Sequence, residues 1–172
     1  MKLLRVIVFD GSDARVFDRA AHADEWAVSG AFAFAHHDAG DIAGKERQAF
    51  VNGFLGVPSL GRSTFVSVGE ATPADHLALV DALARHFMDD WGAPGRETAR
   101  AAAHAEVAFA ADLARDLAVN TLLAVRRSFD EDGHIREEFR IIGTPAELAA
   151  EGMDEGAGTL APVSPAAGGT SR

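Results

Sequence analysis

The segment TLLAVRRSFDEDGHIREEFRII, residues 121–142, decides the fold of this chain. Two runs rich in β-branched and aromatic residues, Thr121–Phe129 and His134–Ile142, flank the sequence Asp-Glu-Asp-Gly at 130–133. An Asp-Gly pair between such runs is a strong hairpin signal, because these residues accept the backbone angles of a tight turn. We therefore predict two antiparallel strands joined by this turn.

Two helices are expected upstream of the hairpin. Thr72 can cap the first helix, Pro73 suits its first position, and its apolar residues recur at helical spacing: Val80, Leu83, Ala84, Phe87, Met88 and Trp91. Residues Arg96–Val119 form the second helix, whose alanines allow a close approach to its neighbour. The two helices are therefore predicted to pack as a hairpin.

The first 68 residues alternate β-rich runs with turn residues and one helical run. We predict strands at Leu3–Phe9, Arg15–Phe17, Glu25–Phe34 and Ser63–Val68, a helix at Asp41–Leu55, and a loop at Gly56–Gly61. Together with the later elements, this order predicts an α+β fold. We expect a mostly antiparallel sheet with the helical hairpin and one further helix packed on one face.

The composition fits one domain followed by a tail. The chain has 172 residues, of which 48% are hydrophobic and 24% charged, a balance that supports one core. We assign residues 1–150 to a single α+β domain. Residues 151–172 are rich in glycine, alanine and proline, and we expect a flexible C-terminal tail there.

Charge and residue usage exclude several classes of function. Lysine and arginine number 16 against 26 acidic residues, which gives a net charge of −10 and removes the usual driving force for nucleic-acid binding. No apolar run is long enough for a membrane span or a signal peptide, so we expect a cytoplasmic protein without membrane contact. The absence of cysteine removes disulfides, thiolate nucleophiles and cysteine-ligated metals. No motif indicates a cofactor.

The sequence His36-His37-Asp38 has the composition of a metal site. Its spacing argues against that interpretation, because consecutive histidines in an extended chain point in opposite directions. We expect a solvated polar loop here and no metal site. A site formed by His36, His37 and Asp38 is the alternative.

The segment Gly53–Thr64 is the expected functional surface. Its run GVPSLGRS has phosphate-loop spacing, but it precedes a strand where a phosphate loop precedes a helix, so we do not expect nucleotide binding. Arg62 can present a planar fork of donors to a carboxylate, a phosphate or a backbone carbonyl. The candidate binding residues are Arg62, Ser63, Asn52, Trp26 and Phe34.

Three stretches, at residues 26–34, 47–56 and 61–65, resemble an uncharacterised family of small proteins from alphaproteobacteria. The resemblance extends through the first 142 residues. It carries no catalytic motif to this chain, so it assigns no site residue. It implies a bacterial, cytosolic accessory role linked to the maturation of cofactor-containing enzymes.

Two functions follow from these features. The first is a non-catalytic accessory or protein-interaction module that binds a protein partner or a second copy of the chain, because no nucleophile, base and orienting group occur in a recognisable order. The second is a small-molecule-binding protein or enzyme whose polar groups gather around Gly53–Thr64. A concave pocket favours the second, and a flat aromatic patch favours the first. We expect the first, without catalytic activity.

Overall fold

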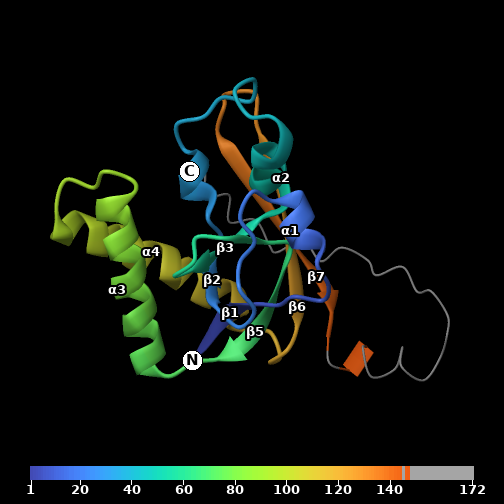
Figure 1. The fold of residues 1–172 in the computed structure, drawn as a ribbon. Coiled ribbons are helices and arrows are strands. Elements are labelled where there is room, and N and C mark those ends of the chain that lie inside the picture. Colours follow the sequence, from blue (N-terminus) through green and yellow to red (C-terminus); the bar gives the residue numbers. More distant parts are fainter. Residues whose placement is uncertain (145, 148–172) are drawn as a thin grey trace.

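A computed structural model describes residues 1–144 and 146–147 of the chain (Figure 1). The strands are β1 Lys2–Val6, β2 Trp26–Val28, β3 Phe54–Val57, β4 Arg62–Ser63, β5 Phe65–Glu70, β6 Leu122–Phe129 and β7 Ile135–Gly143. The helices are α1 Ser12–Val16, α2 Gly44–Asn52, α3 Pro73–Asp89 and α4 Arg96–Ala114, with the 3-10 helix η1 at Ala31–Phe34. The tail expected at residues 151–172 lies outside the described part.

The seven strands form one curled sheet in the order β4-β3-β2-β1-β5-β6-β7. Every pair of neighbouring strands is antiparallel. The curl is evident from the rings of Phe54 on β3 and Phe139 on β7, which lie 6.1 Å apart although four strands separate β3 from β7 in this order. The predicted α+β class with a mostly antiparallel sheet is confirmed.

The hairpin at residues 121–142 forms as predicted. Strands β6 and β7 pair along their length, from Leu122 opposite Gly143 to Phe129 opposite Ile135. Along β6, Val125 and Arg127 are buried whereas Arg126 between them is exposed. This alternation arises because successive side chains of a strand point to opposite faces. An arginine thus occupies one of the inward positions of β6.

The helical hairpin is also confirmed. The side-chain oxygen of Thr72 accepts a hydrogen bond from the Asp75 backbone amide, and the Asp75 carboxylate accepts one from the Thr72 amide. These bonds satisfy amides that the first turn of α3 leaves open, and those from Thr72 lower the pKa of Asp75. Helices α3 and α4 pack against each other, and α4 contacts β1 and β2. None of the described helices has the length and apolar character needed to cross a bilayer.

Among the predicted N-terminal strands, Arg15–Phe17 is wrong and Glu25–Phe34 is too long. Residues 15–17 belong to the end of helix α1 and its cap, where the Phe17 amide donates to the Asp13 carbonyl at 2.9 Å. The strand expected at Glu25–Phe34 stops at Val28 and is followed by η1. Gly30 has a φ of 82°, a left-handed conformation that ends the extended chain.

The helix predicted at Asp41–Leu55 is too long. It ends at Asn52, and Phe54–Val57 form the fully buried strand β3. A strand that is buried on both faces lacks the alternation of apolar and polar residues that identifies a strand in a sequence. The apolar residues Phe54 and Leu55 therefore fit the end of the predicted helix equally well. The predicted loop at 56–61 begins too early, because Gly56 and Val57 are buried residues of β3, and residues 58–61 form the turn of the β3–β4 hairpin.

We predict that Thr72→Ala lowers the free energy of unfolding by about 1 kcal/mol, because it removes the cap of α3. Urea denaturation followed by circular dichroism measures this change. Thr98→Ala is the control, since Thr98 is exposed inside α4 and alanine is the better helix former there. A Thr72→Ala protein as stable as wild type would contradict the importance of this cap.

Candidate functional site

Two buried arginines from different strands of the curled sheet lie next to each other. Arg62 on β4 is 8% exposed and Arg127 on β6 is 2% exposed. Both donate to the carbonyl oxygen of Gly53, from Nη1 of Arg62 at 3.2 Å and from Nη1 of Arg127 at 2.8 Å. A buried guanidinium requires compensation for its lost hydration, so the partners of each arginine indicate its role.

Arg127 is extensively compensated within the fold. Its Nε lies 3.2 Å from the Glu137 carboxylate, whose side chain is 10% exposed. Its Nη1 donates to the Phe50 carbonyl at 2.9 Å, and its Nη2 donates to the carbonyl and the side-chain oxygen of Ser29. The Ser29 hydroxyl in turn donates to Glu137. These contacts join β6 to the ends of β2 and α2, which gives Arg127 a structural role.

Arg62 is compensated differently. Its Nη1 donates to the Gly30 carbonyl at 3.3 Å as well as to Gly53, and its guanidinium carbon lies 4.9 Å from the centre of the Phe34 ring. Within residues 1–144 and 146–147, no carboxylate forms an ion pair with it. Burial, and secondarily the charge of Arg127, lower the pKa of Arg62 to about 9. Arg62 therefore remains charged at neutral pH.

Backbone contacts on both sides fix the position of Arg62. It pairs with Leu55 across the β3–β4 hairpin, while its amide donates to the Arg19 carbonyl at 2.8 Å and its carbonyl accepts the Ala21 amide at 2.9 Å. Gly30 provides the room for its side chain, since a Cβ there would lie 2.7 Å from Nη1 of Arg62. The site is thus built by segments from four parts of the chain.

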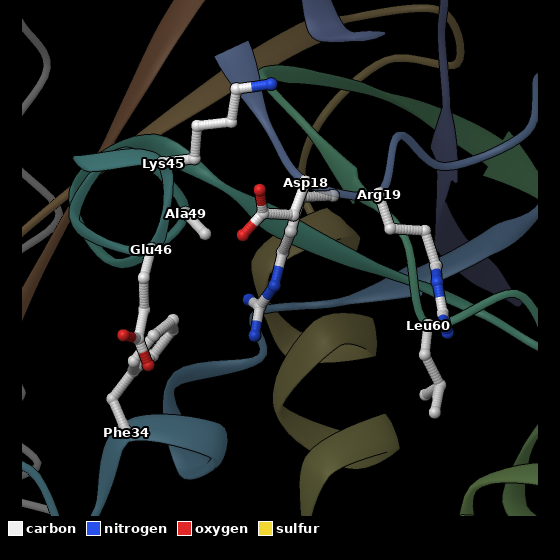
Figure 2. A pocket seen from close by; sticks show the side chains of 8 residues that line it. Asp18, Arg19, Phe34, Lys45, Glu46, Ala49 and Leu60 are labelled. Carbon is white, nitrogen blue, oxygen red and sulfur yellow. The ribbon is translucent and has the colours of Figure 1, made fainter. Parts of the chain in front are cut away.

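A pocket of about 430 Å³ opens beside Arg62 (Figure 2). Its lining comes from the segment after α1, from η1, from α2 and from the β3–β4 hairpin, and consists of Asp18, Arg19, Phe34, Lys45, Glu46, Ala49, Leu60 and Arg62. Arg62 and Phe34 are the buried members of this set, whereas the charged groups of α2 and of the segment after α1 are exposed. The pocket therefore has a buried cation and a mixed, solvated rim.

The pocket brings together two of the five candidate binding residues, Arg62 and Phe34. Ser63 is buried, and its hydroxyl donates to the Phe65 carbonyl at 2.7 Å. Asn52 ends α2, and Trp26 on β2 lies under the Arg5 guanidinium, whose carbon is 4.9 Å from the ring centre. These three residues do not line the pocket.

The structure does not gather His36, His37 and Asp38 around one point. His37 lies with Nε2 3.4 Å from the Glu46 carboxylate, and its ring centre is 6.0 Å from that of Phe34. His36 and Asp38 are exposed. His37 therefore belongs to the surroundings of the pocket.

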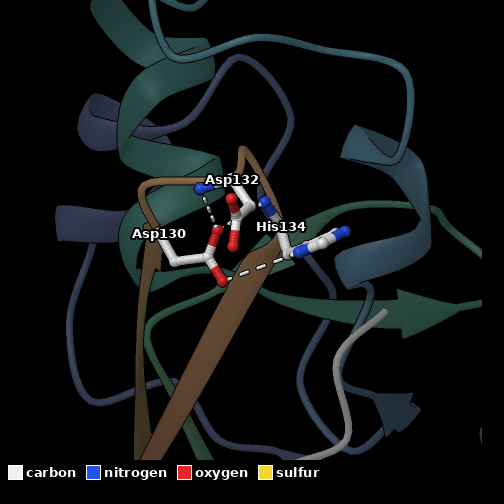
Figure 3. A group of neighbouring side chains, drawn as sticks. All are labelled: Asp130, Asp132 and His134. Carbon is white, nitrogen blue, oxygen red and sulfur yellow. Dashed lines mark hydrogen bonds and ion pairs between the residues drawn. The ribbon is translucent and has the colours of Figure 1, made fainter.

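A different triad, Asp130, Asp132 and His134, is the one described group of three potential metal ligands within 4.8 Å (Figure 3). It occupies the β6–β7 turn, where Asp130 accepts the backbone amides of Asp132 and His134, each at 2.9 Å. Its second oxygen faces His134 at 3.7 Å and Arg136 at 3.5 Å. The hydrogen bond that the His134 backbone amide donates makes the largest contribution to lowering the pKa of Asp130. These contacts are those of a side chain that closes a turn.

Several residues of the site escaped the sequence analysis. Arg127 had a detectable signal, because it continues the inward-facing series of Leu123 and Val125 on β6. Asp18, Lys45 and Glu46 carried no signal, since exposed charges on short helices and loops are common. Only the fold shows that these three line one pocket.

Comparison with known proteins identifies one relative group. A family model described as "Family of unknown function (DUF6505)" matches residues 1–154. No curated protein and no solved structure matches the chain significantly.

We predict a much larger loss of stability for substitution of Arg127 than for substitution of Arg62. Arg127→Met leaves Glu137 buried without its ion pair, and we expect a loss of about 3–5 kcal/mol in the free energy of unfolding. Arg62→Met removes a buried charge that lacks an ion pair, and Arg127 still donates to Gly53, so we expect a change within about 1–2 kcal/mol. Urea denaturation of both variants measures the difference. Equal losses would show that Arg62 is as structural as Arg127.

Proposed function

The chain belongs to a family of unknown function (DUF6505), so we propose its function from the pocket. We propose that the protein binds a small organic anion at Arg62. One observation carries the proposal. The Arg62 guanidinium is buried at the wall of the pocket and has no ion pair among the described residues. An anionic group in the pocket supplies the missing countercharge, and a planar guanidinium suits a carboxylate or a phosphate.

The charges of the pocket support this assignment. Arg62, Arg19 and Lys45 are basic, whereas Asp18 and Glu46 are acidic, so the lining has an excess of one positive charge. The whole chain, by contrast, has a net charge of −10. A local excess of positive charge on an acidic protein selects anions at this point of the surface.

The size and the apolar walls of the pocket support an organic ligand. Its volume of about 430 Å³ falls in the range of small-molecule sites. Phe34, Ala49 and Leu60 contribute apolar surface beside the charged groups. An ion without an apolar part leaves this surface unused, whereas an organic acid of modest size contacts both.

The biological setting of this binding is also part of the proposal. We assign the protein a non-catalytic accessory role in the bacterial cytoplasm, as the family resemblance implies, with the anion as a ligand. The lack of cysteine fits a reducing compartment. A role beside cofactor-containing enzymes is compatible with a protein that holds a small acid.

We predict that pentanoate raises the thermal unfolding temperature of the wild type and leaves that of Arg62→Met unchanged. A ligand at one hundred times its dissociation constant stabilises the folded state by about 2.7 kcal/mol. Arg136→Met is the control, since Arg136 is an exposed residue of β7 outside the pocket. Because Arg62 loses its proton as the pH rises through about 9, the stabilisation should be complete at pH 7 and should decrease above pH 9.

Isothermal titration at pH 7 gives the same comparison directly, with inorganic phosphate as a second probe. Binding of pentanoate to the wild type and to Arg136→Met, but not to Arg62→Met, supports the proposal, whereas binding of phosphate alone contradicts its organic part. If neither anion binds the wild type, or if Arg62→Met binds as tightly as the wild type, the pocket is not an anion site.

A protein-interaction role is the second candidate, and exposed apolar side chains favour it. Val8 and Phe9, which follow β1, are 43% and 61% exposed, and the Phe9 ring contacts that of Phe65 at 5.7 Å between centres. Sedimentation of the wild type and of Phe9→Ser at equal concentration tests self-association here. A smaller mass for the variant supports a homo-oligomer, and equal masses contradict one that uses this surface.

A further inference from the structure

We infer that the ligand of the pocket is a zwitterion, a small amino carboxylate whose carboxylate lies on Arg62 and whose ammonium group lies on the acidic part of the rim. This inference rests on the proposed anion binding and extends it to a class of compound. The observation behind it is that two carboxylates, those of Asp18 and Glu46, line the same pocket as the buried guanidinium without forming an ion pair with it.

Asp18 is the more informative of the two carboxylates. It stands next to Arg19, whose carbonyl accepts the Arg62 amide, so its position relative to Arg62 is fixed by the backbone. Its side chain has no hydrogen bond or ion pair with any residue that the structure describes. Figure 2 shows its carboxylate directed toward α2, across the pocket. Asp18 is thus available as an acceptor for a ligand cation.

Glu46 approaches the pocket from the opposite wall, on the first turn of α2. Its carboxylate lies 3.4 Å from Nε2 of His37, and it extends toward Phe34 in Figure 2. Two carboxylates from different elements thus flank the space in front of a buried cation. A ligand with an ammonium group meets an opposite charge there, whereas a dianion meets two like charges.

The basic side chains of the rim do not remove this preference. The Nη1 of Arg19 donates to the Ser59 carbonyl at 3.3 Å, which holds its guanidinium on the β3–β4 turn. Lys45 points away from Glu46 and Phe34 in Figure 2, and it forms no ion pair with a described residue. The two basic side chains of the rim, Arg19 and Lys45, equal its two carboxylates in number. The formal charge that is left over is that of Arg62.

A matched set of five-carbon probes tests the inference: pentanoate, pentylamine, 5-aminopentanoate and L-2-aminopentanoate. We expect at least one aminopentanoate to bind the wild type about tenfold more tightly than pentanoate, because a charged hydrogen bond is added. Pentylamine, which lacks the carboxylate, should bind more weakly than both. Isothermal titration at pH 7 measures the four affinities.

The variant Asp18→Asn tests whether Asp18 binds the ammonium group of the ligand. It should reduce the preference for the aminopentanoate over pentanoate from about tenfold to about twofold or less, while the affinity for pentanoate stays the same or rises. Asp89→Asn is the control, since Asp89 is an exposed residue of α3 outside the pocket. Circular dichroism of both variants checks that the fold is retained.

The possible outcomes separate the inference from the proposed function. Equal affinities for pentanoate and both aminopentanoates overturn the zwitterion assignment and leave anion binding in place. Binding of inorganic phosphate without binding of any organic acid overturns the zwitterion assignment and also the organic part of the proposed function, and it leaves only an inorganic-anion site. If none of the carboxylates and no phosphate binds, both the inference and the proposed function are wrong.

Discussion

The guanidinium of Arg127 holds together parts of the chain that the strand order keeps apart. It extends from β6 to carbonyl oxygens at the end of α2 and after β2, and it neutralises Glu137 on β7. Each of these carbonyl oxygens lies at or just beyond the end of a helix or strand. The helix or strand therefore supplies no backbone amide as a donor for it. A leucine or valine at this inward position fills space but satisfies none of them. The junction of β6 with α2 and with the segment after β2 is therefore made by a buried polar group.

The same constraint explains why Arg62 is special. Both arginines donate to the Gly53 carbonyl, which places two positive charges close together, and Glu137 forms an ion pair with Arg127. Burial and the second guanidinium oppose the charged form of Arg62, as its lowered pKa shows. A fold selected for stability alone is served better by an apolar side chain at this position. The arrangement is instead suited to a site whose countercharge arrives with a ligand.

The fold was predictable where local chemistry and tertiary packing agree. The Asp130–Gly133 turn and the capping pair of Thr72 and Asp75 specify their elements within a few residues, and both elements form. The N-terminal part was not predictable in the same way. β2 stops at Val28, and the left-handed backbone of Gly30 starts η1 and places the Gly30 carbonyl near Arg62, while β3 is buried on both faces within the curled sheet. Both features are imposed by residues distant in the sequence.

The site was predictable to a smaller degree, for a related reason. Arg62 could be identified as the unusual charge in a glycine-rich segment, but its burial follows from a hairpin and from contacts with residues 19–21 that no local pattern shows. In the sequence, nothing distinguishes Asp18 and Glu46 from other acidic residues. They become candidate binding residues only because the fold places them in the same pocket as the buried Arg62. A ligand that carries both signs of charge satisfies each of these groups at once. In the function that we propose, recognition is therefore a property of the assembled pocket, in which the buried charge of Arg62 and the exposed charges of the rim define the orientation of the ligand.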